Sequence, residues 1–259
     1  MAESATPPDP VVIHVPHSST CIPEYFLDQF ISTSDRLEVI HEALVDYDTD
    51  KMAAVLERVI TFPYSRLLVD VERFIDDSVE EMAEIGMGVF YSVDHELQQM
   101  RREITAQEHD ALFELYVAHH QQLEEAVDDA LETFNRCLLI DLHSYSEARL
   151  PYERSGGERP QLCIGTDEGH TPRDLINLVT EIAEEHGYQT AINTPFAGTL
   201  VPLKHYRHDT RVESVMLEWR KDLYRTNGIT DEAALQSLRN VISEIARQWK
   251  MMRSCQRPE

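Results

Sequence analysis

The sequence predicts an α/β fold in which a central mixed, mostly parallel sheet is flanked by helices. Short apolar runs rich in β-branched residues alternate along the chain with longer segments of helical periodicity, and this alternation is typical of sheets covered on both faces. The length of 259 residues suits a single α/β domain, since such domains commonly reach roughly 200–250 residues. We therefore expect a loose, proline-rich leader over residues 1–10 and one domain over residues 11–259.

Six runs have the length and composition of strands, and four segments have helical periodicity. The helical segment 34–59 is interrupted at residues 46–50, where Asp48 or Thr49 is expected to cap the second half. Gly187 is expected to end the third helical segment. The strand-like runs are residues 11–16, 66–71, 138–143, 161–165, 189–192 and 214–219, and the helical segments are 34–59, 94–134, 172–186 and 231–251.

Charge and composition exclude several classes of protein. The formal net charge is −24, and Lys and Arg form no basic stripe, which argues against nucleic-acid binding. No apolar run is long enough to cross a membrane, and the first residues lack the pattern of a secretory signal. The four cysteines are scattered without a CxxC pair, so we expect a cytoplasmic protein in a reducing compartment. An anionic substrate would need specific arginines to overcome the acidic surface.

Two histidines stand where strand-like runs end. His17 follows the run 11–16 and His143 ends the run 138–143. The carboxyl ends of strands open onto the ligand crevice of an α/β sheet, so both imidazoles are expected to share one metal site. Catalytic zinc needs three protein ligands and an open position for water. The short HExxH arrangement is absent, and Asp46, Asp48 and Glu24 compete as the third ligand on spacing alone.

Glu218 is the candidate for general base and acid. It lies inside the apolar run 214–219, where an unpaired charge is costly to bury without a purpose. The competing interpretation is that Glu218 faces solvent or pairs with Arg220.

Arg73 is the candidate for binding a substrate carboxylate, because a guanidinium can donate two parallel hydrogen bonds to it. The competing interpretation is an ion pair with an acidic neighbour. These neighbours are Asp70, Glu72, Asp76 and Asp77. A Ser-His-Asp hydrolase is a rival for the whole chain, since serine follows both His17 and His143, but the sequence contains no GxSxG elbow.

Several separate motifs stand in order along the chain: residues 16–19, Asp46, residues 64–70, 141–144, 193–198, 216–218 and 223–224. In order and approximate spacing they resemble the N-formylglutamate amidohydrolase family over roughly residues 11–225. A weaker resemblance to zinc carboxypeptidases rests on residues 69–73, 143–145 and 218–220. The chain departs from that pattern at Glu72, which stands where an asparagine usually precedes the arginine.

The resemblance implies a phosphorylase/hydrolase-like fold and one Zn²⁺ per chain, bound by His17, Asp46 and His143. It also implies Glu218 as general base and acid and Arg73 as the carboxylate clamp. The expected reaction is hydrolysis of a small anionic N-acyl amino acid, with N-formyl-L-glutamate giving formate and L-glutamate. Further expected substrate contacts are Arg66 at the oxyanion, Ser144 and Tyr145 around the pocket, and Tyr206. The alternatives are a carboxypeptidase-like peptidase, an aminoacylase of other acyl preference, or a non-catalytic metal- or ligand-binding module.

Overall fold

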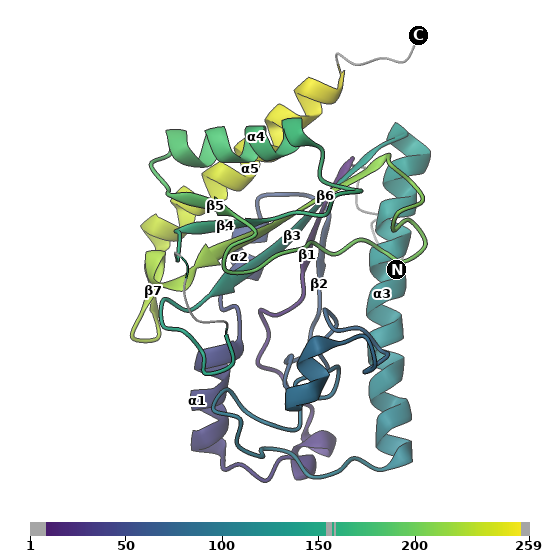
Figure 1. Cartoon of the computed structure of the whole chain (residues 1–259), viewed down its shortest axis with the longest axis vertical. Helices are drawn as coiled ribbons and strands as arrows, with labels where there is room; N and C mark the ends of the chain where they lie inside the picture. The colour runs from purple at the N-terminus through teal and green to yellow at the C-terminus, as the bar shows by residue number, and fades with distance from the viewer. Residues whose placement is uncertain (1–8, 154–156, 158, 255–259) are drawn as a thin grey trace, which may run out of the picture.

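A six-stranded mixed sheet forms the centre of the molecule in the computed structural model, which describes residues 9–153, 157 and 159–254 (Figure 1). The strand order is β2-β1-β3-β6-β4-β5, and every neighbouring pair is parallel except β4 with β6. The predicted mixed, mostly parallel sheet is thus confirmed. The strands are β1 (Val11–Val15), β2 (Val59–Thr61), β3 (Cys137–Tyr145), β4 (Leu162–Gly165), β5 (Thr190–Ile192) and β6 (Val212–Arg220), and β7 (Arg225–Thr226) with β8 (Ile229–Thr230) forms a separate hairpin.

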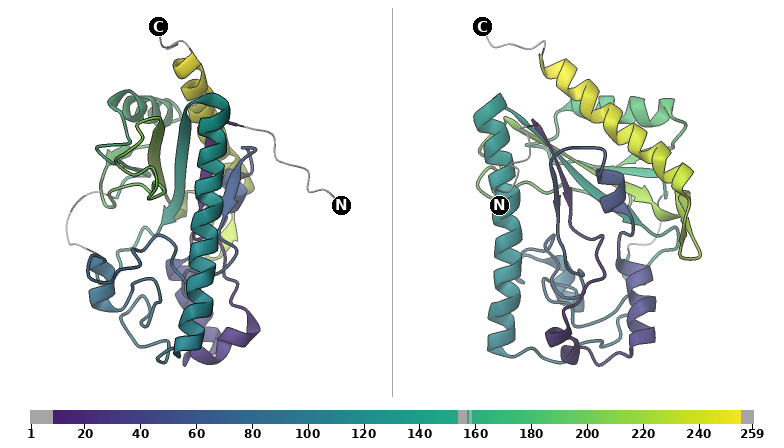
Figure 2. Two further views of the ribbon diagram at one scale, coloured as in Figure 1. Left: turned by 90° about the vertical axis from the view of Figure 1, so that its right-hand side faces the viewer. Right: turned by 180° about the vertical axis from the view of Figure 1, so that it is seen from behind.

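Helices cover both faces of the sheet, because successive side chains of each buried strand point to opposite faces. Val11, Ile13 and Val15 pack in one apolar cluster with α2 (Thr49–Ala53), α4 (Arg173–Glu185) and α5 (Glu232–Ser254). Val12 and Leu139 pack on the other face against α3 (Ala106–Phe134), which runs along most of the length of the molecule (Figure 2). None of the helices in the described part of the chain is long and apolar enough to span a membrane.

A second body of structure lies beneath the sheet in Figure 1. It contains α1 (Ser34–Leu44), the 3₁₀ turns η1 (Glu24–Gln29) and η2 (Glu81–Ile85), and a long stretch without strands from residue 62 to residue 105. These elements share an apolar cluster that includes Phe26, Ile40, Leu68 and Tyr91. A further short turn, η3 (Lys221–Leu223), follows β6.

The prediction of a strand at residues 66–71 is wrong. Residues 66–71 form consecutive turns, in which Leu67 N donates to Ser65 Oγ at 3.1 Å and Leu68 N to Ser65 O at 2.9 Å. Leu67 and Leu68 are nevertheless fully buried. The apolar run therefore reflects burial in the cluster beneath the sheet rather than membership of a ladder.

Helix boundaries account for the other differences. The long helix begins at Ala106 instead of near residue 94, because Thr105 and Glu108 form a capping box there. The T-x-x-E spacing is a sequence signal that could have located this start. The interruption of the segment 34–59 is confirmed, but its second half is helical only over Thr49–Ala53, and Val59 begins β2. Asp48 precedes α2 at φ 67° without capping it through its side chain. Of the expected leader, residues 1–8 lie outside the described residues.

Candidate metal and catalytic centre

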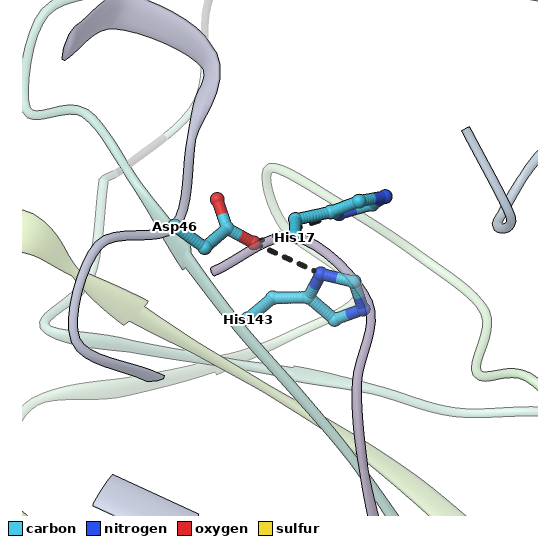
Figure 3. Close-up of side chains that lie close together, drawn as sticks. All are labelled: His17, Asp46 and His143. Carbon is cyan, nitrogen blue, oxygen red and sulfur yellow. Dashed lines mark hydrogen bonds and ion pairs between the residues drawn. The ribbon is translucent and has the colours of Figure 1, made fainter. Parts of the chain in front are cut away.

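Three side chains from distant parts of the sequence converge at one end of β1 and β3. The rings of His17 and His143 lie 5.1 Å apart between centroids. The carboxylate of Asp46 lies between them, with Oδ2 at 3.1 Å from His143 Nδ1 and 3.6 Å from His17 Nδ1 (Figure 3). All three side chains are buried. The backbone joins them too, since Asp46 N donates to His17 O at 2.9 Å.

The other nitrogen of each imidazole is held by an outer carboxylate. His17 Nε2 lies 2.9 Å from Asp70 Oδ1, and His143 Nε2 lies 3.1 Å from Asp141 Oδ1. An ionised carboxylate can only accept, so both histidines donate through Nε2 and turn Nδ1 toward Asp46. This arrangement is typical of metal-binding histidines, whose second nitrogen fixes the tautomer and the ring orientation.

The converging atoms fit the donor set of a divalent cation such as zinc. His17 Nδ1 is buried and has no hydrogen-bond partner among the described residues. Two imidazole nitrogens and one carboxylate oxygen lie within 4.8 Å of one another, which matches the three protein ligands of an open zinc site. A bound cation would give His17 Nδ1 the partner that this buried nitrogen lacks among the described residues.

The structure brings only Asp46, of the three acidic candidates, to the two histidines. Asp48 is the acceptor for the hydroxyl of Thr230 and lies 2.6 Å from Lys51 Nζ. Glu24 lies in η1 and is exposed.

Glu218 lies beside His143 on the adjacent strand. The two residues are directly paired in the parallel register of β3 and β6, so their side chains share a face of the sheet. Glu218 is buried, and its Oε2 has no hydrogen-bond partner among the residues the structure describes. Burial raises the pKa of Glu218, and the nearby Asp46 raises it further, although His143 and Arg66 oppose this. Arg220 instead binds Asp222 at 2.7 Å.

Asp70 is the centre of a buried network that includes Arg66. Arg66 donates to Asp70 Oδ2 from Nε at 3.2 Å and from Nη2 at 2.8 Å, and Tyr91 donates to the same oxygen at 2.6 Å. Burial opposes ionisation of Asp70, but Arg66 and His17 hold its pKa well below the ordinary value. Arg66 is thus committed to Asp70, and its positive charge is fixed near the cluster.

Arg73 is less committed than Arg66. Its nearest acidic contacts are Asp70 at 3.6 Å from Nε and Glu80 at 3.9 Å from Nη1, both longer than a hydrogen bond. The neighbouring Glu72 turns toward His14, at 3.1 Å. The negative charge of Glu72, which precedes Arg73 in the sequence, therefore faces His14.

The remaining predicted substrate contacts, Ser144, Tyr145 and Tyr206, lie in three different positions. Ser144 alternates with His143 along β3 and so points to the opposite face of the sheet. Tyr145 shares the face of His143, but its hydroxyl donates to Pro160 O. Tyr206 is not brought to the cluster: its hydroxyl lies 3.3 Å from Asp167, and its ring stacks on His170, which binds the carbonyl of the first residue of β6.

Sequence reasoning missed three supporting residues. Asp141 precedes His143 by two positions on the same strand face, and this spacing was a usable signal. Tyr91 had no such signal. Lys221, just after β6, donates to Val45 O at 2.8 Å and so fixes the backbone immediately before Asp46.

Comparison with known proteins identifies the family. The family model for N-formylglutamate amidohydrolase matches residues 9–225. The chain belongs to this family. No curated protein matches it in sequence.

Two solved structures resemble this family member in fold. A crystal structure of N-formylglutamate amidohydrolase from Ralstonia eutropha JMP134 is 23% identical, with a TM-score of 0.81 and coverage of 95% of each chain. A gene product from Agrobacterium tumefaciens is 17% identical, with a TM-score of 0.70 and coverage of 96% of this chain and 92% of the other. Both agree with the α/β architecture described above.

Proposed function

We propose that this member of the family hydrolyses the amide bond of N-formyl-L-glutamate to formate and L-glutamate, with Zn²⁺ bound by His17, Asp46 and His143. The observation that carries the proposal is the buried, uncommitted carboxyl of Glu218 beside a His-Asp-His set whose outer nitrogens are already held. A general base of raised pKa next to a metal is the combination that amide hydrolysis requires.

Zinc bound there supplies Lewis-acid polarisation of the acyl carbonyl and lowers the pKa of a water molecule toward about 7. Glu218 takes a proton at Oε2 from the attacking water as the water oxygen bonds to the acyl carbon. When the carbon–nitrogen bond breaks, protonated Glu218 returns the proton to the departing amine. Its raised pKa suits both halves of this transfer, because the carboxyl must hold the proton between the two steps.

The arginines supply the positive charge that an anionic substrate needs in a chain of net charge −24. Arg73 is assigned to the α-carboxylate, because its two acidic neighbours, Asp70 at 3.6 Å and Glu80 at 3.9 Å, lie beyond hydrogen-bond distance. Arg66, fixed by two hydrogen bonds to Asp70, is assigned to the developing oxyanion.

The location we propose is the reducing cytoplasm. Cys137 and Cys163 are buried free thiols, and Cys21 is an exposed one. Thiols that remain unpaired fit a reducing compartment better than an oxidising one.

The test is release of formate from N-formyl-L-glutamate by the zinc-loaded protein and by Glu218→Gln. We expect Glu218→Gln to lower kcat by roughly 10²–10⁴-fold, the usual contribution of general acid–base catalysis, while zinc content stays unchanged. Glu213→Gln is the matched control, because Glu213 lies on the same strand and binds Arg253 instead. Unchanged turnover in Glu218→Gln would exclude Glu218 from the chemistry.

A substrate panel separates the proposal from its alternatives. Formyl, acetyl and succinyl derivatives of glutamate, together with short peptides, should be compared at equal enzyme concentration. Preference for the formyl derivative supports the proposal. Faster cleavage of peptides or of the larger acyl groups would favour a carboxypeptidase-like peptidase or an aminoacylase instead.

A further inference from the structure

A second group of metal-ligand atoms lies behind the centre described above. His14 on β1 and Asp141 on β3 share the sheet face covered by α3, and Glu72 approaches from the irregular segment 62–105. His14 Nδ1 lies 3.0 Å from Asp141 Oδ1 and 3.1 Å from Glu72 Oε1. These contacts are as short as the 3.1 Å between His143 and Asp46 in the first centre.

The second nitrogen of His14 is also held, by an imidazole instead of the carboxylates that hold those of His17 and His143. His14 Nε2 lies 2.8 Å from Nε2 of His119 on α3. Burial lowers the pKa of His119 to about 2, so that imidazole is neutral and accepts the hydrogen bond. His14 therefore donates through Nε2 and directs Nδ1 toward the two carboxylates, which is the tautomer of a metal-binding histidine with an outer partner.

One proton on His14 cannot satisfy this cluster. Without a cation, a protonated Nδ1 would have one hydrogen, which could point to Asp141 or to Glu72 but not to both. Glu72 Oε1 is a buried atom without a hydrogen-bond partner in the described part of the chain. Two carboxylate oxygens and one imidazole nitrogen thus meet at a point that a single hydrogen cannot serve.

We propose that His14 Nδ1, Glu72 Oε1 and Asp141 Oδ1 form a second site for a divalent transition-metal cation such as Zn²⁺. One imidazole and two carboxylates match the donors that such cations accept, and the ligand atoms lie within 4.8 Å of one another. A cation there neutralises both carboxylates and uses the unpartnered oxygen of Glu72. It also fixes Asp141, whose Oδ1 accepts from His143 Nε2 at 3.1 Å, so the second site supports the first through one carboxylate.

The experiment is a count of bound zinc per chain by mass spectrometry after equilibration in Zn²⁺ and removal of the excess. Asp46→Asn disables the first centre and Glu72→Gln disables the second site. Glu244→Gln is the matched control, because Glu244 forms a His–Glu pair with His186 at 3.0 Å on the surface. We expect two zinc ions in the wild type and in Glu244→Gln, one in each of the other single variants, and none in the double variant Asp46→Asn/Glu72→Gln.

The outcome distinguishes this site from the centre in the proposed function. A zinc content that falls by one in Glu72→Gln supports the second site whether or not Asp46→Asn also loses an ion. A wild-type content of one or fewer that Glu72→Gln leaves unchanged overturns the second site alone.

A cobalt titration keeps the proposal testable if Glu72→Gln fails to fold. Co²⁺ added to Asp46→Asn should give visible absorption bands that saturate at one equivalent, with an unchanged far-ultraviolet circular dichroism spectrum. Absence of these bands in folded Asp46→Asn would overturn the second site.

Discussion

The sheet strands and the irregular segment 62–105 build the same centre by different means. His143 and Glu218 lie on β3 and β6, where the parallel register alone places them side by side. Arg66, Asp70 and Arg73 lie on turns, and hydrogen bonds and buried charges hold them in place. The comparison indicates that His143 and Glu218 are fixed by regular backbone, whereas the two arginines depend on a network centred on Asp70.

The largest expected effect follows replacement of Asp70, which should destabilise the irregular segment 62–105. Asp70→Asn leaves Arg66 buried without its carboxylate, and loss of one partner of a buried ion pair typically costs about 3–5 kcal/mol. We also expect zinc affinity to fall about 10–100-fold, since His17 loses its outer partner. Urea unfolding and zinc titration measure the two effects.

The control for Asp70 is Asp222→Asn, which removes the partner of Arg220 in a more exposed pair. Such pairs contribute about 0–1 kcal/mol. A loss of stability in Asp70→Asn no larger than in this control would mean that the network around Asp70 does not hold the segment.

Replacement of Arg73 should separate binding from chemistry. Arg73→Ala removes charge-assisted hydrogen bonds worth about 1.5–3 kcal/mol, so kcat/KM for N-formyl-L-glutamate should fall roughly 10–150-fold. The α-amide of the same substrate should be affected much less, and this ratio is the measurement. Equal losses for acid and amide would contradict the role of Arg73 as a carboxylate clamp.

Replacement of Lys221 tests whether Asp46 is positioned from the end of β6, because Lys221 connects this end to the backbone before Asp46. Lys221→Met keeps the length of the side chain but loses the buried donor, at a cost of about 1–3 kcal/mol. We expect zinc to bind about tenfold more weakly, a change worth about 1.4 kcal/mol, and Lys221→Arg to restore part of the affinity. Identical zinc affinity in all three proteins would show that Asp46 is positioned without Lys221.

The last prediction concerns His41 of α1. Burial lowers the pKa of His41 to about 4, so the folded protein keeps this imidazole neutral while the unfolded chain binds a proton below pH 6.5. Its contribution is present above pH 6.5 and is lost as the pH falls toward 4, at most about 3 kcal/mol. His41→Gln should reduce the slope of unfolding free energy against pH in this window. An unchanged slope would mean that His41 is protonated in the folded state.

The sequence predicted the sheet better than the segment beneath it, for a physical reason. The apolar runs of β1, β3 and β6 pair with one another in the sheet, and a histidine at the end of such a strand reaches the crevice. The run 66–71 looks the same, but contacts from far along the chain hold it in turns: Asp70 N donates to Val89 O at 2.8 Å, and Arg101 donates to Leu68 O at 3.0 Å. No local pattern encodes such partners, which also explains why Tyr91 was missed.

The direct pairing of His143 with Glu218 limits how genes for such proteins can change. One codon inserted within β3 before His143, or within β6 before Glu218, would turn the following side chain to the other face and separate the two groups. Loops that join the strands carry no such restriction on length. Insertions and deletions should therefore accumulate between the strands, while the number of residues inside each strand stays constant among active enzymes.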